Sequence, residues 1–206
     1  MARAKGNAMW KGKKPCENPQ GAIAIRVREI EENSAEELLC SKFFGMPTIP
    51  KAWKDDFDED VLFFCQIRLE DIAPLDRENR LLHTGYLYIF LDISGGRYAM
   101  KPIVRYSAAA PEIVIDDFNA AIEEFGDVQT AWAMEFSPAD EDADCTRLFG
   151  VPSDWNYEEN APALFMQFDP LDSSMEFMQE TDGYLYFFFG EDEKTLEAIR
   201  LHLENS

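Results

Sequence analysis

The sequence predicts an α+β fold that is internally duplicated, with mostly antiparallel sheets and a few short helices. Three observations lead to this prediction. The apolar segment "GYLYIFL" at residues 85–91 returns as "GYLYFFF" at residues 183–189. Segments of strand length outnumber helical ones and do not alternate strictly with helices, as they would in a βαβ fold. Apolar residues make up 46% of the chain, which is enough for a packed core.

Two further pairs of short segments support the duplication. "KFFGMP" at 42–47 corresponds to "RLFGVP" at 147–152, and "LFFCQI" at 62–67 corresponds to "ALFMQF" at 163–168. Both pairs precede the repeated apolar segment, in the same order in each half. Matches that keep their order along the chain predict an internal repeat.

The expected organisation is one domain with a short leader. The domain covers residues 21–206 and consists of repeats at about 21–107 and 127–206. Residues 1–20 form a separate basic arm, since five of the 19 basic residues fall within the first fourteen positions and no acidic residue does. We expect this arm to be disordered, or to dock on the acidic body or on a partner.

Strands are predicted where apolar and β-branched residues fill short runs between turn residues. The run at 98–107 is expected at a sheet edge, because Pro102 has no N–H to donate to a neighbouring strand. The predicted strands are 22–29, 61–68, 85–92, 98–107, 130–136, 163–168 and 183–189.

The repeated strand is apolar on both faces. Alternation places Tyr86, Tyr88 and Phe90 on one face, with leucine and isoleucine side chains on the other. A strand of this kind is expected to be covered on both sides. The two repeats are therefore expected to pack as one continuous body.

Three helices are predicted. Ser34 and Glu37 form a capping box for a short helix. The segment 116–126 carries apolar residues at helical spacing and ends at Gly126. The segment 191–205 is expected to form a terminal helix.

Charge limits the classes of partner. Nineteen basic and 40 acidic residues give a net charge of −21, which repels nucleic acid and anionic membranes and favours a basic protein partner. No apolar run is long enough to span a bilayer, and no secretory signal is recognisable. Four scattered cysteines without a CxxC pair indicate reduced thiols in a cytoplasmic protein.

Catalytic and metal-binding motifs are not recognisable. His83 and His202, the two histidines, lack metal-ligand spacing. The acidic runs at 55–60 and 140–144 lack the glycine and the glutamate that a calcium loop needs at its sixth and twelfth positions. We therefore expect no cofactor, no metal ion and no catalytic residue, although the sequence leaves enzymatic activity open.

Gln66 and Gln167 are the most informative polar residues, because each lies in an apolar strand at the same point of its repeat. A buried amide needs hydrogen-bond partners. Either both glutamines bond to the backbone at the boundary between the repeats, or they line a cleft there together with Trp132.

The ordered landmarks resemble those of the YwqG-like family, a bacterial family whose function is not established. The resemblance rests on "SKFFGMP" at 41–47, "FFCQI" at 63–67, "GYLYIF" at 85–90, "LFMQF" at 164–168 and "GYLYFFF" at 183–189. It implies an α+β fold with a duplicated sheet and supplies no reaction or cofactor. Phe44 stands where the family usually has the first glycine of a Gly-Gly pair.

Two functions are compatible with these features. The first is a non-enzymatic cytoplasmic recognition protein that binds a basic protein through its acidic surface, for example in a toxin-neutralising, immunity-like role. The alternative is a small-molecule-binding protein or an enzyme with a cleft between the repeats. The sequence does not indicate the oligomeric state.

Overall fold

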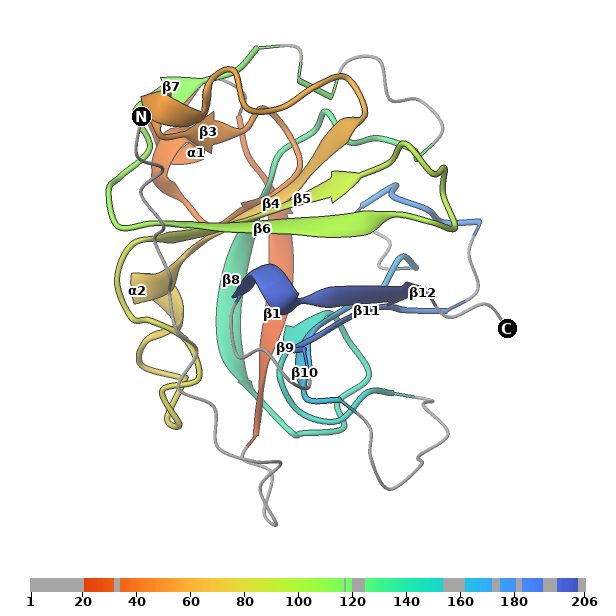
Figure 1. Ribbon diagram of the computed structural model, residues 1–206. Coiled ribbons are helices and arrows are strands. Elements are labelled where there is room, and N and C mark those ends of the chain that lie inside the picture. The colour runs from red at the N-terminus through yellow and green to blue at the C-terminus, as the bar shows by residue number, and fades with distance from the viewer. Residues whose placement is uncertain are drawn as a thin grey trace.

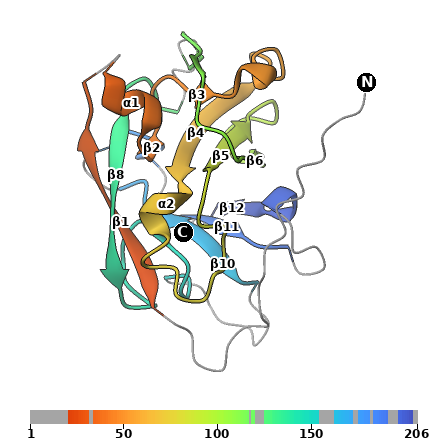
Figure 2. The same cartoon turned by 90° about the vertical axis from the view of Figure 1, so that its left-hand side faces the viewer.

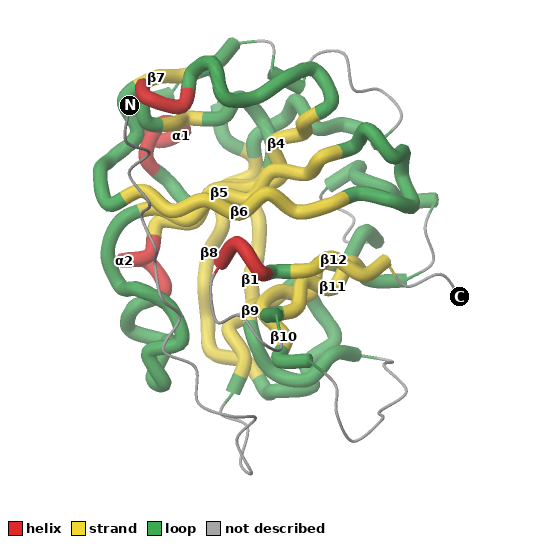
Figure 3. Tube along the Cα trace, viewed as in Figure 1, coloured by secondary structure: helices red, strands yellow, loops and turns green. Residues whose placement is uncertain are grey.

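The computed structural model is dominated by one antiparallel sheet (Figures 1 and 3). It describes residues 21–31, 34–116, 118–119, 125–153, 162–171, 175–180, 183–190 and 196–203, so the basic arm over 1–20 lies outside the described residues. Strands account for 39% of the structure and helices for 8%. The predicted α+β class is therefore wrong, and the fold is mostly β.

Ten strands form this sheet in the order β12-β11-β10-β9-β1-β8-β2-β4-β5-β6. Every neighbouring pair is antiparallel. The strands are β1 (Ala22–Glu29), β2 (Lys42–Phe43), β4 (Val61–Arg68), β5 (Tyr86–Asp92), β6 (Lys101–Ser107), β8 (Trp132–Ala139), β9 (Arg147–Leu148), β10 (Leu164–Phe168), β11 (Leu185–Phe188) and β12 (Arg200–Leu203).

The sheet curls until its two end strands approach each other. The view of Figure 2 has β1 and β8 on one side of the molecule and β6 and β12 on the other. β12 and the 3₁₀ helix η2 (Leu196–Ala198) both contact β6, although β6 and β12 are not neighbours in the hydrogen-bonded order. The sheet is therefore nearly closed, and β6, which contains Pro102, is an edge strand as predicted.

Phenylalanine side chains fill the inside of the curled sheet. Phe64 lies at the centre of this core, with its ring centroid 5.4 Å from Phe43, 5.2 Å from Phe168 and 5.3 Å from Phe187. These rings come from β2, β4, β10 and β11, and so from both repeats. Edge-to-face and tilted ring pairs add to the stabilisation from burial of apolar area. The two repeats thus share one core.

Equivalent segments of the repeats occupy equivalent places in the sheet. The order β2-β4-β5-β6 on one side corresponds to β9-β10-β11-β12 on the other. β1 and β8 pair with each other in the middle, and each also pairs with the short strand of the opposite repeat, β1 with β9 and β8 with β2. The arrangement has an approximate twofold axis between β1 and β8.

A second, smaller layer covers the outer face of β4 and β5. It contains β3 (Thr48–Ile49), β7 (Ile113–Val114) and the 3₁₀ helix η1 (Lys51–Trp53). Tyr86, Tyr88 and Phe90 lie in a cluster beneath this layer, whereas the intervening leucine and isoleucine side chains lie in the inner core. The predicted alternation of the repeated strand is confirmed.

The helices differ most from the sequence-based expectation. α1 (Ala35–Leu39) is confirmed, with the Ser34 hydroxyl accepting a bond from the Glu37 N–H at 3.1 Å. α2 (Leu69–Ile72) was not predicted. The terminal helix is wrong, because residues 200–203 pair with β11 as β12. The predicted helix at 116–126 lies mostly outside the described residues. Among the helices that are described, none is long and apolar enough to cross a membrane.

Candidate functional site

Four polar side chains lie directly opposite one another across the outer face of the first repeat. Lys42 on β2 pairs with Gln66 on β4, Gln66 with Tyr88 on β5, and Tyr88 with Arg105 on β6. We call these four residues the first polar row. Lys42, Gln66 and Tyr88 are fully buried.

The second repeat has the same arrangement. Arg147 on β9 pairs with Gln167 on β10, Gln167 with Tyr186 on β11, and Tyr186 with His202 on β12. We call these the second polar row. Each row therefore runs from a buried cation through an amide and a phenol to an outer basic residue. The two repeats therefore share a cross-strand row of four residues of corresponding type.

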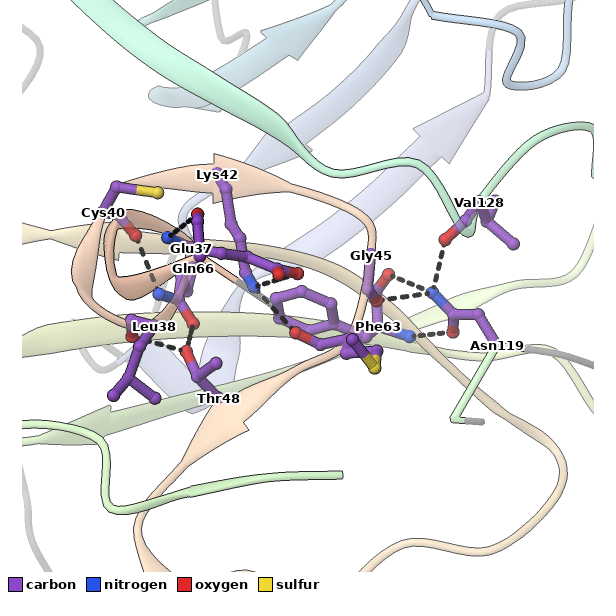
Figure 4. A network of polar contacts seen from close by, with 12 residues as sticks. Glu37, Leu38, Cys40, Lys42, Gly45, Thr48, Phe63, Gln66, Asn119 and Val128 are labelled. Atoms are coloured by element: carbon purple, nitrogen blue, oxygen red, sulfur yellow. Dashed lines mark hydrogen bonds and ion pairs between the residues drawn. The ribbon is translucent and has the colours of Figure 1, made fainter. Parts of the chain in front are cut away.

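Gln66 bonds to backbone and side chain within its own repeat (Figure 4). Its Nε2 donates to the Cys40 carbonyl at 2.8 Å. Its Oε1 lies 2.5 Å from the Thr48 hydroxyl, which also lies 2.9 Å from the Leu38 carbonyl. The amide thus connects β4 to the segments on either side of β2.

Gln167 makes the corresponding contacts. Its Nε2 donates to the Cys145 carbonyl at 3.1 Å and to the Ser153 hydroxyl at 3.0 Å. Its Oε1 accepts from the Ser153 N–H at 2.8 Å and from Arg147 Nη2 at 3.2 Å. Cys145 and Ser153 correspond to Cys40 and Thr48 of the first repeat. Each amide therefore binds the residues that precede and follow the short strand of its own repeat.

Lys42 closes the Phe-Gly-Met-Pro turn of the first repeat. Its Nζ donates to the Met46 carbonyl at 2.7 Å and lies 3.3 Å from Glu37 Oε1 (Figure 4). The Lys42 side chain is completely buried and that of Glu37 nearly so. Burial lowers the pKa of Lys42, and the neighbouring Glu37 carboxylate opposes this shift. The turn of the first repeat is therefore closed by a buried lysine, whose ion-pair partner is the Glu37 carboxylate.

Arg147 closes the Phe-Gly-Val-Pro turn of the second repeat with more bonds. Its Nε donates to the Ala143 carbonyl at 2.7 Å, and its two Nη atoms donate to the carbonyls of Phe149 and Val151. Val151 corresponds to Met46 in the first repeat. A guanidinium group offers five donors in one plane, so Arg147 can satisfy several carbonyls at once.

Both turns contain a phenylalanine in the left-handed region of backbone conformation. Phe44 has φ of 51° and Phe149 has φ of 63°, and the glycines that follow have φ of 71° and 83°. Left-handed backbone is unfavourable for a side chain larger than that of glycine or asparagine. Both phenylalanine rings are buried in the core. Packing and the buried cations thus hold two strained positions.

The structure does not bring the three sequence-predicted site residues together. Gln66 and Gln167 bond to backbone, but each does so inside its own repeat, and four strands lie between β4 and β10. Trp132 pairs with Phe43 and packs against the inner core, on the opposite face of the sheet from Gln66. Among the described residues, the Trp132 Nε1 has no hydrogen-bond partner.

Sequence reasoning noted a basic residue before each turn but not its role. The segment "CSKFFGMPT" at 40–48 matches "CTRLFGVPS" at 145–153 over all nine positions, and this match includes the basic residue and the partners of each amide. The residues at the second position of these segments, Ser41 and Thr146, make equivalent hydrogen bonds. The Ser41 hydroxyl accepts from the Arg68 N–H at 2.9 Å, and the Thr146 hydroxyl accepts from the Asp169 N–H at 3.0 Å. The match between these two nine-residue segments therefore marks the residues that surround each amide.

The two phenols of the polar rows differ in one respect. The Tyr186 hydroxyl donates to the Ser153 carbonyl. Tyr88, its equivalent, is also fully buried, but its hydroxyl has no hydrogen-bond partner in the part of the chain that the structure describes. Burial, and then the neighbouring Tyr86, raise the pKa of Tyr88 far above its ordinary value, so the phenol is neutral.

The acidic segment 55–60 lies beside the first polar row. Its five carboxylate residues are all exposed, and Arg105 Nη1 donates to Asp56 Oδ2 at 2.6 Å. The Arg105 guanidinium also lies 4.6 Å from the Phe57 ring and 5.3 Å from the Trp53 ring. The Phe57 ring packs against that of Phe90 in a tilted arrangement, with 4.1 Å between the ring centroids. Aromatic and ionic contacts therefore fix this acidic loop to the sheet.

The acidic segment 140–144 precedes the turn of the second repeat. Asp140, Asp142 and Asp144 are exposed, and the Tyr184 hydroxyl donates to Asp144 Oδ1. In the described part of the chain, no group of three histidine, cysteine, aspartate or glutamate residues is arranged to hold a metal ion. Both acidic segments therefore present exposed carboxylates at the surface.

Comparison with known proteins gives no match: no family model, no curated protein and no solved structure is similar to this chain. The resemblance to the YwqG-like family therefore stays a prediction.

Proposed function

We propose that the chain is a non-enzymatic recognition protein that binds a basic protein partner through its acidic surface. The observation that carries this proposal is the loop at 55–60, which exposes five carboxylates and is fixed to the sheet by Trp53, Phe57 and the Arg105–Asp56 ion pair. A loop that is already ordered loses less conformational entropy on binding than a disordered acidic tail.

Charge complementarity supports the choice of a basic partner. The chain carries a net charge of −21, and such a field speeds the encounter with a cationic surface and slows the encounter with nucleic acid. Cys40, Cys65 and Cys145 are free thiols, which is in keeping with the cytoplasmic location that forms part of this proposal. A role in neutralising a basic toxin would be one form of this function.

The test is capture of basic proteins from a lysate of the source organism by two variants with equal net charge. The loop variant neutralises four exposed carboxylates of the acidic loop and keeps Asp56 for Arg105. The control neutralises four exposed carboxylates elsewhere. The loop variant is Asp55→Asn, Asp58→Asn, Glu59→Gln and Asp60→Asn, and the control is Glu29→Gln, Glu31→Gln, Glu135→Gln and Glu176→Gln.

We expect the wild type and the control to retain the same basic protein at moderate salt, and the loop variant to lose it. Because net charge is matched, a loss in both variants would mean that attraction is general and not confined to the loop. Retention by both variants, or no basic protein retained by the wild type, would contradict the proposal.

A site between the two repeats receives less support. Gln66 and Gln167 are separated by four strands, and Trp132 lies on the other face of the sheet, so the three residues named for such a site do not converge.

A further inference from the structure

We propose that the loop at residues 73–84 is a strap that opens and closes over the turn of the second repeat while the rest of the fold stays intact. This first strap leads from α2 to β5, and it runs toward the end of the sheet at which β1 begins (Figure 2). The second strap is residues 175–180 of the corresponding loop, which lies between β10 and β11. The first strap is separate from the acidic loop at 55–60, so the proposal goes beyond the recognition of a basic protein.

Each strap contacts the turn of the opposite repeat. The guanidinium carbon of Arg80, in the first strap, lies 3.6 Å from the centre of the Phe149 ring. The Phe177 ring, in the second strap, lies 4.9 Å from the Phe44 ring, measured between centroids. Phe44 and Phe149 are the two left-handed residues of the turns. Each strained turn is therefore covered by a strap from the other repeat.

The second strap is held by apolar burial and by backbone hydrogen bonds. Phe177 and Met178 are buried members of the inner core. The Met178 N–H donates to the Phe125 carbonyl at 2.9 Å, and the Asp127 N–H donates to the Glu176 carbonyl at 3.0 Å. Release of this strap would bring apolar core surface into water, which makes its opening costly.

The first strap is held mainly by one buried carboxylate. The Asp76 side chain is completely buried, and it accepts from the N–H of Arg80 at 3.1 Å and from the N–H of Leu81 at 2.9 Å. It also lies 3.5 Å from Arg80 Nε and 3.3 Å from His83 Nε2. Asp76 therefore fixes both the backbone of the strap and the side chain that covers Phe149.

The first strap buries much less apolar surface than the second. Within residues 73–84, only Asp76 and Leu81 are buried. A segment that is held by hydrogen bonds to one side chain, with little apolar burial, opens more easily than a segment packed into the core. Opening of the first strap uncovers Phe149 on its Arg80 side, while Phe177 continues to cover the turn of the first repeat.

The first measurement is native-state hydrogen exchange of the wild type, followed at single amides by NMR. The N–H groups of Arg80 and Leu81 report on the first strap, because both donate to Asp76. Those of Met178 and Asp127 report on the second strap. The first pair should be protected at least about 100-fold less than the second, and low urea should accelerate its exchange less steeply. Equal protection of the two pairs, or equal urea dependence, would overturn the proposal.

The second measurement repeats the exchange experiment with Asp76→Asn and Glu78→Gln, which each remove one negative charge from the first strap. Glu78 is the matched control, since its carboxylate also lies near Arg80, at 3.9 Å from Nε. Asp76→Asn should accelerate exchange at Leu81 at least about tenfold and at Met178 less than about threefold, and Glu78→Gln should change both rates less than about threefold.

Equal acceleration at Leu81 and Met178 in Asp76→Asn would mean that Asp76 stabilises the whole fold and not the strap, and would overturn the proposal. The first measurement uses the wild type, so it decides the proposal where Asp76→Asn fails to fold. Neither measurement involves a basic protein, so the outcome is independent of the proposed function.

Discussion

Gln66 and Gln167 illustrate how a single buried amide can organise a turn. Each is fully buried, and each satisfies a cysteine carbonyl and a hydroxyl from the segment around its turn. Their position in the sequence, inside apolar strands and at equal places in the repeats, made them identifiable in advance. Their partners were not, because the contacts between these amides and carbonyls 26 and 22 residues away depend on the register of strands only two residues long.

Replacing either glutamine by leucine should lower the free energy of unfolding by about 2–3 kcal/mol, since each change leaves buried polar groups without partners. The exposed Gln129 is the matched control, and Gln129→Leu should change stability by less than about 0.5 kcal/mol. Urea denaturation measures all three variants. Losses below about 1 kcal/mol at Gln66 and Gln167 would show that water replaces the lost bonds.

Cys40 gives a prediction for alkaline pH. Burial raises the pKa of its thiol from the ordinary value of 9.0 to about 11, although the nearby Lys42 acts in the opposite direction. Between these values the unfolded chain releases the proton and the folded chain keeps it, so the free energy of unfolding falls as the pH rises. One proton accounts for a slope of at most about 1.4 kcal/mol per pH unit.

The measurement is the slope of unfolding free energy against pH between about 9 and 11. It should be shallower in Cys40→Ala than in the wild type, whereas the two proteins should show parallel curves below pH 8. Identical slopes above pH 9 would mean that the Cys40 thiol titrates normally in the folded protein.

In each Phe-Gly-x-Pro turn, the glycine has a positive φ and little space for a side chain. A Cβ atom at Gly45 would lie 2.6 Å from the Ala131 Cβ, and one at Gly150 would lie 2.2 Å from the Glu141 carbonyl oxygen. Gly96 also has a positive φ, of 76°, but open space around it. The three glycines therefore separate the cost of the backbone conformation from the cost of a steric clash.

Gly96→Ala should reduce the free energy of unfolding by about 1 kcal/mol, which is the cost of left-handed backbone alone. Gly45→Ala and Gly150→Ala should each reduce it by about 3 kcal/mol, since overpacking adds to that cost. Chemical denaturation of the three variants checks this. A Gly45→Ala variant as stable as Gly96→Ala would show that the turn can shift away from Ala131.

The terminal element shows why short segments are hard to assign from sequence. Apolar residues at 196, 199 and 203 suggested a helix, but Leu201 and Leu203 also alternate with the exposed Arg200 and His202, which is a strand pattern. Eight residues fit both periods. Pairing of β12 with β11, a contact that local sequence does not encode, selects the strand.

At the scale of the whole molecule, the duplication was predictable and the closure of the sheet was not. Repeated motifs in one order indicated two units with a common core, and the strands that carry them occupy equivalent places. In the structure, β2 pairs with β8 of the other repeat, and β9 pairs with β1 of the other repeat. The paired segments lie about 90 and 125 residues apart along the chain. This pairing between the repeats joins the two halves into one curled sheet. The alternation of apolar and polar residues within each strand does not show which strands pair.

The same scale applies to the proposed function, because only the complete fold places the acidic loop on a fixed surface. The most direct test is the Kd of the captured basic protein for the two charge-matched variants, measured by titration calorimetry. The proposal predicts that the four substitutions at residues 55–60 raise the Kd at least tenfold, and that the control at Glu29, Glu31, Glu135 and Glu176 raises it less than about threefold. Equal effects of the two variants would contradict it.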